Sequence, residues 1–190
     1  MTMAALATDV MLPAFPTMAA ELGVSDAAIQ RVLSVFMLGY GLPQLLVGSA
    51  ADRFGRRPVL MAGMVVYAAG TLVCLLAPGF TGLLIGRFIQ GVGCAAGPVL
   101  ARTVLRDLYS GSQLGRMMSF AMIFFTAAPL LAPSIGAVIL QFGDWHWQFV
   151  FLLVIAGLML LMIVRMLPET APRLDPAALS PRGLARNALH

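Results

Sequence analysis

The sequence has little charge and no lysine, and both absences narrow the class of protein. Only 11% of its 190 residues are charged, whereas soluble domains carry roughly 25%. All twelve cationic side chains are therefore arginines. The net charge of +4 does not describe a basic surface for nucleic acid, because the arginines lie in short segments between apolar runs. A soluble domain and a nucleic-acid-binding protein are both excluded.

Histidine and cysteine are also scarce, with two of each. A membrane serine hydrolase would need a histidine at the depth of its serine, whereas His146 lies at the end of an apolar run and His190 lies beyond the last run. The sequence has no Walker-type phosphate-binding loop and no paired metal ligands, so we expect no nucleotide-driven pumping, no metal and no cofactor. Cys74 and Cys94 fall within apolar runs and are expected to be reduced packing residues.

Long uncharged runs dominate the sequence, whose mean hydropathy is +0.92. A bilayer core of about 30 Å needs about 20 apolar residues for each helical crossing. Four runs of 20 to 29 uncharged residues occur between residues 31 and 165. Together with the apolar N-terminal segment, they predict an all-α membrane protein with six transmembrane helices, near residues 1–20, 30–51, 58–77, 80–101, 116–141 and 146–167.

The arginines are distributed unevenly between the two ends of these helices. Arg31 alone falls on one side, and Arg87 falls within the fourth helix. Because positive residues concentrate in cytoplasmic loops, we expect the arginine-rich side to be cytoplasmic, with both chain ends on that side. The absence of lysine and the alanine- and glycine-rich composition indicate a bacterial source. We therefore expect a multi-pass protein of a bacterial inner (plasma) membrane. The ten arginines on that side are Arg53, Arg56, Arg57, Arg102, Arg106, Arg116, Arg165, Arg173, Arg182 and Arg186.

Two charges are predicted to lie within the bilayer. The run 88–101 has only 14 residues, about 21 Å of helix, so the fourth helix must begin near Phe80 and carry Arg87 inside the membrane. Asp9 lies in the first apolar segment. A charge at mid-membrane costs about 2.5–3.5 kcal/mol on insertion scales, so such residues usually face a cavity or a partner. Their depths differ by roughly 6 Å, which an arginine side chain can span.

The turn "GSAADRFGRRP" (48–58) holds most of the charge in its neighbourhood. Gly48 would let the second helix approach a neighbour closely, and Gly55 would allow a sharp turn. Asp52 can bond the arginines one turn further on, which would make the loop a stiff latch. Pro58 suits the first position of the third helix. A positive-inside anchor alone would need only the charges.

These residues resemble a family signature. The spacing of Gly48, Asp52, Arg53, Gly55, Arg56 and Arg57 is similar to the motif between helices 2 and 3 of the major facilitator superfamily. "LLIGRFIQGVGCAAG" (83–97) matches the fourth-helix pattern of that family, and "LLAPSIGAVI" (130–139) resembles its fifth-helix antiporter motif at Pro133 and Gly136. "LATDVMLPAFP" (6–16), "PQL" (43–45) and "LPET" (167–170) resemble its bicyclomycin-resistance branch of drug/proton antiporters.

The resemblance implies an architecture and a division of the chain. It predicts half of a twelve-helix fold, made of two inverted three-helix repeats. Residues 1–167 would form the N-terminal six-helix bundle. Residues 168–190 would form a cytoplasmic linker to a second six-helix half, in the same or another chain. The turn 48–58 would then latch the cytoplasmic side.

The resemblance also implies roles for individual residues. Helices 1 and 4 line the central cavity in this family, so Asp9 and Arg87 are expected to face each other there. Two interpretations stay open, a static ion pair that fixes packing and a proton-coupled site in which protonating Asp9 releases Arg87. Gln90, one turn from Arg87, would either bond cargo or join helices. Pro129, Pro133 and Gly136 would place a bend in the fifth helix, either static or used for alternating access.

The function implied is proton-coupled efflux of small amphipathic drugs or metabolites by alternating access, driven by the proton gradient. The chain would not be an enzyme, and its partners would be the cargo, the lipid bilayer and the second half, with no nucleic acid. The alternative is an incomplete half-transporter, or a membrane module that does not transport and needs a partner half.

Overall fold

The computed structural model describes residues 2–171 and 174–178, and within those ranges every regular element is a helix. Six stretches are long and apolar enough to cross a membrane, which confirms the predicted all-α, six-span class. The elements are α1 (Met3–Asp9), η1 (Leu12–Ala14), α2 (Phe15–Glu21), α3 (Asp26–Ile29), α4 (Arg31–Phe54), α5 (Arg56–Leu76), α6 (Phe80–Cys94), α7 (Ala96–Leu108), α8 (Gly111–Phe142) and α9 (His146–Met166).

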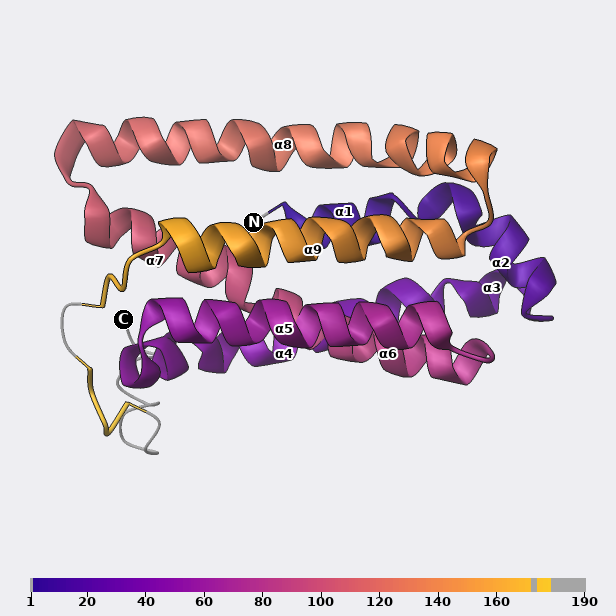
Figure 1. Cartoon of the computed structure of the whole chain (residues 1–190), viewed down its shortest axis with the longest axis horizontal. Coiled ribbons are helices and arrows are strands. Elements are labelled where there is room, and N and C mark those ends of the chain that lie inside the picture. Colours follow the sequence, from indigo (N-terminus) through magenta and orange to yellow (C-terminus); the bar gives the residue numbers. More distant parts are fainter. Residues whose placement is uncertain (1, 172–173, 179–190) are drawn as a thin grey trace.

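The helices lie alongside one another as a bundle, with α9 between α8 and α5 in the view of Figure 1. Helix α5 packs on α6 and α9, α4 packs on α6, and α1 with η1 packs on α8. Each of these contacts joins an element of the first three spans to an element of the last three. The two three-helix repeats are therefore interlocked.

The first span is broken into three pieces, where the sequence predicted one helix over 1–20. Pro13 has no N–H to donate to the carbonyl of Asp9, and α1 ends at that residue. A short 3₁₀ turn follows, and α2 restarts with Pro16 in its first turn, where a missing N–H costs no bond. Asp9 therefore lies at a break in the helix.

Three spans are longer than predicted, and one of them is the second, which runs over Asp26–Phe54. The fourth runs over Phe80–Leu108, with a break at Ala95, and the fifth over Gly111–Phe142. They have 29 and 32 residues, or about 43 and 48 Å, which exceeds the roughly 30 Å of hydrocarbon. A count of uncharged residues locates the part of a helix inside the membrane, whereas these helices continue beyond it with charged residues.

Glycines place α6 in the middle of the bundle. A Cβ added at Gly91 would collide with the Phe36 carbonyl oxygen of α4, and one at Gly93 with the Tyr67 backbone nitrogen of α5. Small residues at such crossings let helix backbones approach closely. This central position buries Arg87 and Gln90, two polar side chains of α6.

Three connections lie together at one end of the bundle, namely the α4–α5 turn, the end of α7 and the segment after α9. Arg56 bonds Asp107 at the end of α7, and Glu169 bonds the start of α5. This is the end that the arginine distribution predicts to be cytoplasmic, and the side of the membrane stays a prediction. Of the predicted linker 168–190, residues 172–173 and 179–190 lie outside the described residues.

Candidate functional site

Arg87 is the one charged side chain within the described residues that is fully buried, with 0% exposure. Its Nη1 donates to the Ala7 carbonyl oxygen at 3.0 Å and to Gln90 Oε1, and its Nε donates to the Val32 carbonyl oxygen at 3.5 Å. The guanidinium carbon lies 4.4 Å from the centroid of the Phe36 ring. One guanidinium group thus joins α1, α4 and α6.

These contacts compensate the buried charge without a carboxylate. The Ala7 carbonyl is among the last four of α1, which have no partner within that helix and lie at the negative end of its dipole. A ring face also attracts a cation. The second terminal nitrogen, Nη2, is buried and makes no hydrogen bond. The site therefore holds a cation with one donor still open.

A hydrogen-bonded chain extends from Arg87 into α5. Gln90 accepts from Arg87 through Oε1 and donates from Nε2 to Thr71 Oγ1 at 2.8 Å. Thr71 in turn donates to the Tyr67 carbonyl oxygen at 2.8 Å. Gln90 and Thr71 are both fully buried, so in this conformation Gln90 joins helices. Sequence reasoning missed Thr71, because no local pattern indicates a partner 19 residues away.

Asp9 does not pair with Arg87, so the predicted ion pair is wrong for this conformation. The hydrogen bond that Asp9 accepts comes from the neighbouring Thr8 hydroxyl, at 3.0 Å. Ala7 is fully buried against the core, whereas Asp9 is partly exposed. Two residues turn an α-helix by about 200°, so the Asp9 side chain leaves the opposite face of α1. Depth along the helix axis alone does not indicate this rotation.

The charged turn has the geometry of a braced corner. Asp52 forms an ion pair with Arg56, one turn further along, and Arg56 Nε also bonds Asp107 Oδ2 at 3.3 Å. Gly55 has φ +98°, a backbone conformation that side chains resist. Helix α5 begins at Arg56, two residues before the predicted start, so Pro58 is its third residue and still costs no bond.

Glu169 completes this corner, and sequence reasoning missed its role. Its carboxylate accepts from the backbone N–H groups of Arg56 at 2.9 Å, Arg57 at 3.2 Å and Ala171 at 2.9 Å. Partial burial raises the pKa of Glu169, but these backbone hydrogen bonds outweigh it and hold that pKa below its usual range. An acid at the start of α5 also suits the helix dipole. The bonds from Arg56 and Arg57 join residues over 110 positions apart, so no local signal could find them.

The segment after α9 makes further bonds at this end. Thr170 donates to Asp107 Oδ2 at 3.2 Å, and the Asp175 N–H donates to the Asp52 carbonyl oxygen at 2.9 Å. Arg57 Nη2 donates to the Val164 carbonyl oxygen at 2.7 Å, near the end of α9. The corner is therefore tied to three other parts of the chain.

Two residues of the predicted motif have fewer contacts within the described part of the chain. Arg53 lies over the ring of Phe54, with its guanidinium carbon 5.2 Å from the centroid. A Cβ added at Gly48 would meet nothing within 4 Å. The prediction that Gly48 lets α4 approach a neighbour closely is thus wrong for the neighbours present here.

The predicted bend residues lie where α8 crosses the first span. Pro129 and Pro133 are inside α8, which runs without interruption over Gly111–Phe142. Gly136 is buried, and a Cβ there would collide with the Val10 carbonyl oxygen. Gln148 Nε2 donates to the Gly136 carbonyl oxygen at 3.3 Å. Gly136 therefore lets α8 pack against the break that follows Asp9, and its use as a moving hinge stays a prediction.

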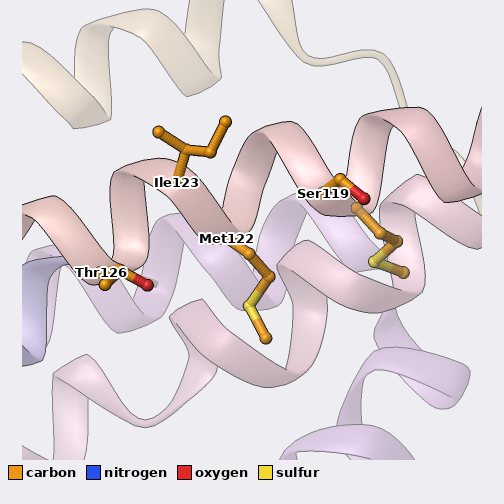
Figure 2. A pocket seen from close by; sticks show the side chains of 5 residues that line it. Ser119, Met122, Ile123 and Thr126 are labelled. Atoms are coloured by element: carbon orange, nitrogen blue, oxygen red, sulfur yellow. The ribbon is translucent and has the colours of Figure 1, made fainter.

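A hollow of about 530 Å³ lies along the first half of α8. Figure 2 shows the side chains that line it, all from this one helix. They combine two thioethers with two hydroxyls, which suits contacts with amphipathic molecules of varied shape. The lining residues are Met118, Ser119, Met122, Ile123 and Thr126.

Comparison with known proteins agrees with this architecture. The model of the Major Facilitator Superfamily matches residues 1–187. The chain is 37% identical over 167 residues to multidrug resistance protein D of Escherichia coli (strain K12), covering 88% of this chain and 42% of that protein. It is 35% identical over 181 residues to a bicyclomycin resistance protein homolog of Haemophilus influenzae, covering 95% of this chain and 46% of that protein.

Solved structures share the fold. The human organic anion transporter MFSD10 (TETRAN) superposes with a TM-score of 0.78 at 23% identity, covering 97% of this chain and 50% of that chain. A peptide transporter POT mutant in complex with alafosfalin superposes with a TM-score of 0.80 at 16% identity, covering 99% and 41%. The chain thus spans about half, or less, of the length of the proteins that it matches.

Proposed function

Because the chain belongs to the major facilitator superfamily, we propose that it is the N-terminal half of a secondary active transporter that exports small amphipathic drugs or metabolites in exchange for protons. Two relatives are named for resistance to multiple drugs and to bicyclomycin, which supports drugs as the cargo class. Six membrane spans and bacterial relatives support the inner membrane as the location, with both ends cytoplasmic as the arginines predict.

The observation that carries the proton coupling is the position of Asp9. It is a carboxyl at a break within the first span, partly exposed, with no cation paired to it in the described residues. A carboxylate at such depth is costly unless a proton or a cation neutralises it. In the proposal, Asp9 holds a proton in one state and gives it up in the other.

Arg87 would connect this exchange to the bundle. It holds the Ala7 carbonyl two residues before Asp9, and its Nη2 is still an open donor. In the proposal, the break after Asp9 moves when Asp9 gains or loses its proton. The Ala7 carbonyl then moves as well, and Arg87 changes its hydrogen-bond partners. The chain through Gln90 and Thr71 would carry that change to α5, which begins at the braced corner. The corner would act as the latch whose bonds break and reform as the two halves rock.

Cargo would contact the α8 hollow at a site completed by the second half. Substrate sites in this kind of fold lie at the midplane between the repeats or halves. One face of α4 also supports a second half. Gly41 and Gly48 have open space around them, and Leu45 between them is 82% exposed. Small residues beside a projecting leucine suit close packing against another helix.

Efflux in a drug-sensitive bacterial host tests the proposal. The chain is expressed with its second half, and drug susceptibility is measured across a panel with and without a proton uncoupler. We expect resistance that the uncoupler abolishes and that Asp9→Asn removes, with the mutant still inserted in the membrane. Asp26→Asn, which changes an exposed carboxyl, is the matched control and should keep resistance. Full resistance in Asp9→Asn would refute the proton site.

The alternative function, an incomplete half that needs a partner, is favoured by the share of its relatives that the chain covers. The same host tests it, with the 190-residue chain expressed alone and then together with a separate second half. Resistance only in the combination supports a half-transporter. Resistance from the chain alone would show that it assembles with copies of itself.

A further inference from the structure

A second cavity lies inside the bundle and contains no group used by the proposed transport mechanism. Its volume is about 130 Å³, and its lining comes from α1, α5, α6, α7 and α9. Four of the eleven lining residues carry sulfur, namely Met3, Met64, Cys94 and Met159. Three of these are at most 7% exposed, and Met159 packs against the same core cluster. Four different helices therefore bring sulfur to one space.

The rest of the lining explains why the space stays open. Gly93, Ala96, Gly97 and Ala101 form a surface of small residues, and the other lining residues are aliphatic or proline. No lining residue has an oxygen or nitrogen in its side chain. Water needs two to four polar partners, so a cavity of this kind excludes it. Methionine normally fills irregular gaps, yet here three methionines surround a gap that they leave unfilled.

The backbone beside Cys94 is interrupted. Cys94 is the last residue of α6, and α7 begins two residues later. Pro98 has no N–H to donate to the Cys94 carbonyl, four residues earlier. The cavity therefore borders the break between α6 and α7.

We propose that this cavity is a binding site for a soft monovalent cation, Cu(I) or its analogue Ag(I), held by Cys94 and the thioethers of Met3, Met64 and Met159. Thiolate and thioether ligands select Cu(I), whereas hard cations require oxygen ligands that the lining lacks. Charge favours a monovalent ion as well. One thiolate and one monovalent cation make a neutral complex, and a divalent cation would leave a net charge buried at membrane depth.

Binding follows a simple balance. Cu(I) replaces the proton on the Cys94 sulfur, and that proton leaves to the bulk solvent by the route through which the ion enters. The thioethers donate electron pairs without losing a proton. No oxidation or reduction is involved, because the ion enters as Cu(I). Leu60 lies one turn beyond Arg56 on α5, so the cavity is close to the arginine-rich end of the bundle, from which an ion would enter.

Titration of the purified chain with Cu(I) against a coloured Cu(I) chelator, under reducing conditions without oxygen, tests the site. We expect one Cu(I) per chain. Loss of a neighbour that only orients a metal ligand costs about 10–100-fold in affinity, so loss of a ligand should cost at least about tenfold. Cys94→Ser, Met64→Leu and Met159→Leu should each show that loss. Cys74→Ser and Met166→Leu remove sulfur outside the cavity and should bind as the unchanged protein does.

X-ray absorption at the copper edge gives an answer even where a variant folds poorly, because it uses the unchanged protein. Three or four sulfur neighbours around copper support the site. A copper surrounded by nitrogen or oxygen, or an affinity that Cys94→Ser and Met64→Leu leave unchanged, overturns it. Neither measurement requires transport, so failure of the proposed efflux and failure of this site are distinguishable.

Discussion

Arg56 and Arg87 are the same side chain in two settings, and their partners differ in kind. Arg56, at the end of the bundle, bonds two carboxylates, Asp52 and Asp107. Arg87, within the fourth span, contacts two backbone carbonyls, an amide oxygen and an aromatic ring. The side chain of Arg56 is 12% exposed, whereas Arg87 is not exposed at all.

The difference follows from the cost of removing charge from water. Near water, two carboxylates beside a guanidinium cost little, and each pair adds modest stability. In a low-dielectric interior a carboxylate partner brings its own desolvation cost, which the attraction repays only in excellent geometry. Dipoles that are already inside the membrane, such as the carbonyls at the end of α1, neutralise the cation without that second cost. A charge in a membrane span therefore does not imply a nearby opposite charge.

The largest effect should come from removing the buried guanidinium. Arg87→Ala leaves the Ala7 carbonyl and Gln90 without their donor and opens a void, so we expect a loss of about 3 kcal/mol or more in stability. Thermal unfolding in detergent measures it. Arg56→Ala should cost only about 1 kcal/mol. Arg87→Met fills much of the same volume without a charge. If this variant is as stable as the unchanged protein, the hydrogen bonds of Arg87 do not compensate for the cost of burying its charge.

Gly55→Ala should have the next largest effect. The new Cβ would lie 2.5 Å from Glu169 Oε2, on a residue whose φ is +98°. Backbone in such a region costs a non-glycine residue of order 1–3 kcal/mol. Thermal unfolding of Gly55→Ala in the presence and absence of Glu169→Ala separates the two causes. The stability lost through Gly55→Ala should be smaller in the Glu169→Ala background, because the collision is gone, but should persist because φ is still positive. A loss that vanishes in that background would mean that the collision is its only cause.

The bond from Gln90 to Thr71 should contribute less. Thr71→Val keeps the shape and removes the hydroxyl, which leaves the Gln90 amide and the Tyr67 carbonyl unpaired and should cost about 1–2 kcal/mol. Thr71→Ser retains the hydroxyl and is the matched control. Thermal unfolding of both variants provides the measurement. Equal stability of the valine and serine variants would contradict the network.

The smallest effect is the pH dependence of the corner. The pKa of Glu169 is lowered in the folded chain, so its contribution is fully present above the usual Glu pKa of about 4.3 and is lost as pH falls through the folded value. The unchanged protein and Glu169→Gln should therefore differ in melting temperature at pH 7, and converge below about pH 4. A difference that grows on acidification would contradict the assigned bonds.

Local patterns were enough to predict the class of fold and the corner. Runs of uncharged residues predicted six spans because the bilayer imposes a length on each helix. Gly55 and Asp52 indicated a sharp, bonded turn, because the positive φ of Gly55 and the ion pair of Asp52 with Arg56 both act within a few residues. Local patterns could not predict the carboxylate of Glu169 at the start of α5, because its partners are more than 110 residues away.

The sequence by itself determined that Arg87 belongs to an apolar span, since fewer than 20 uncharged residues separate it from the next charge. Only the tertiary structure decided what surrounds it. Breaks at Asp9 and Ala95 and the glycines of α6 set how the helices rotate and how closely they approach. That rotation turns Asp9 away from Arg87, and it brings sulfur from four helices to one cavity. The physical reason is that the direction of a side chain depends on its angle about the helix axis and not on its depth alone.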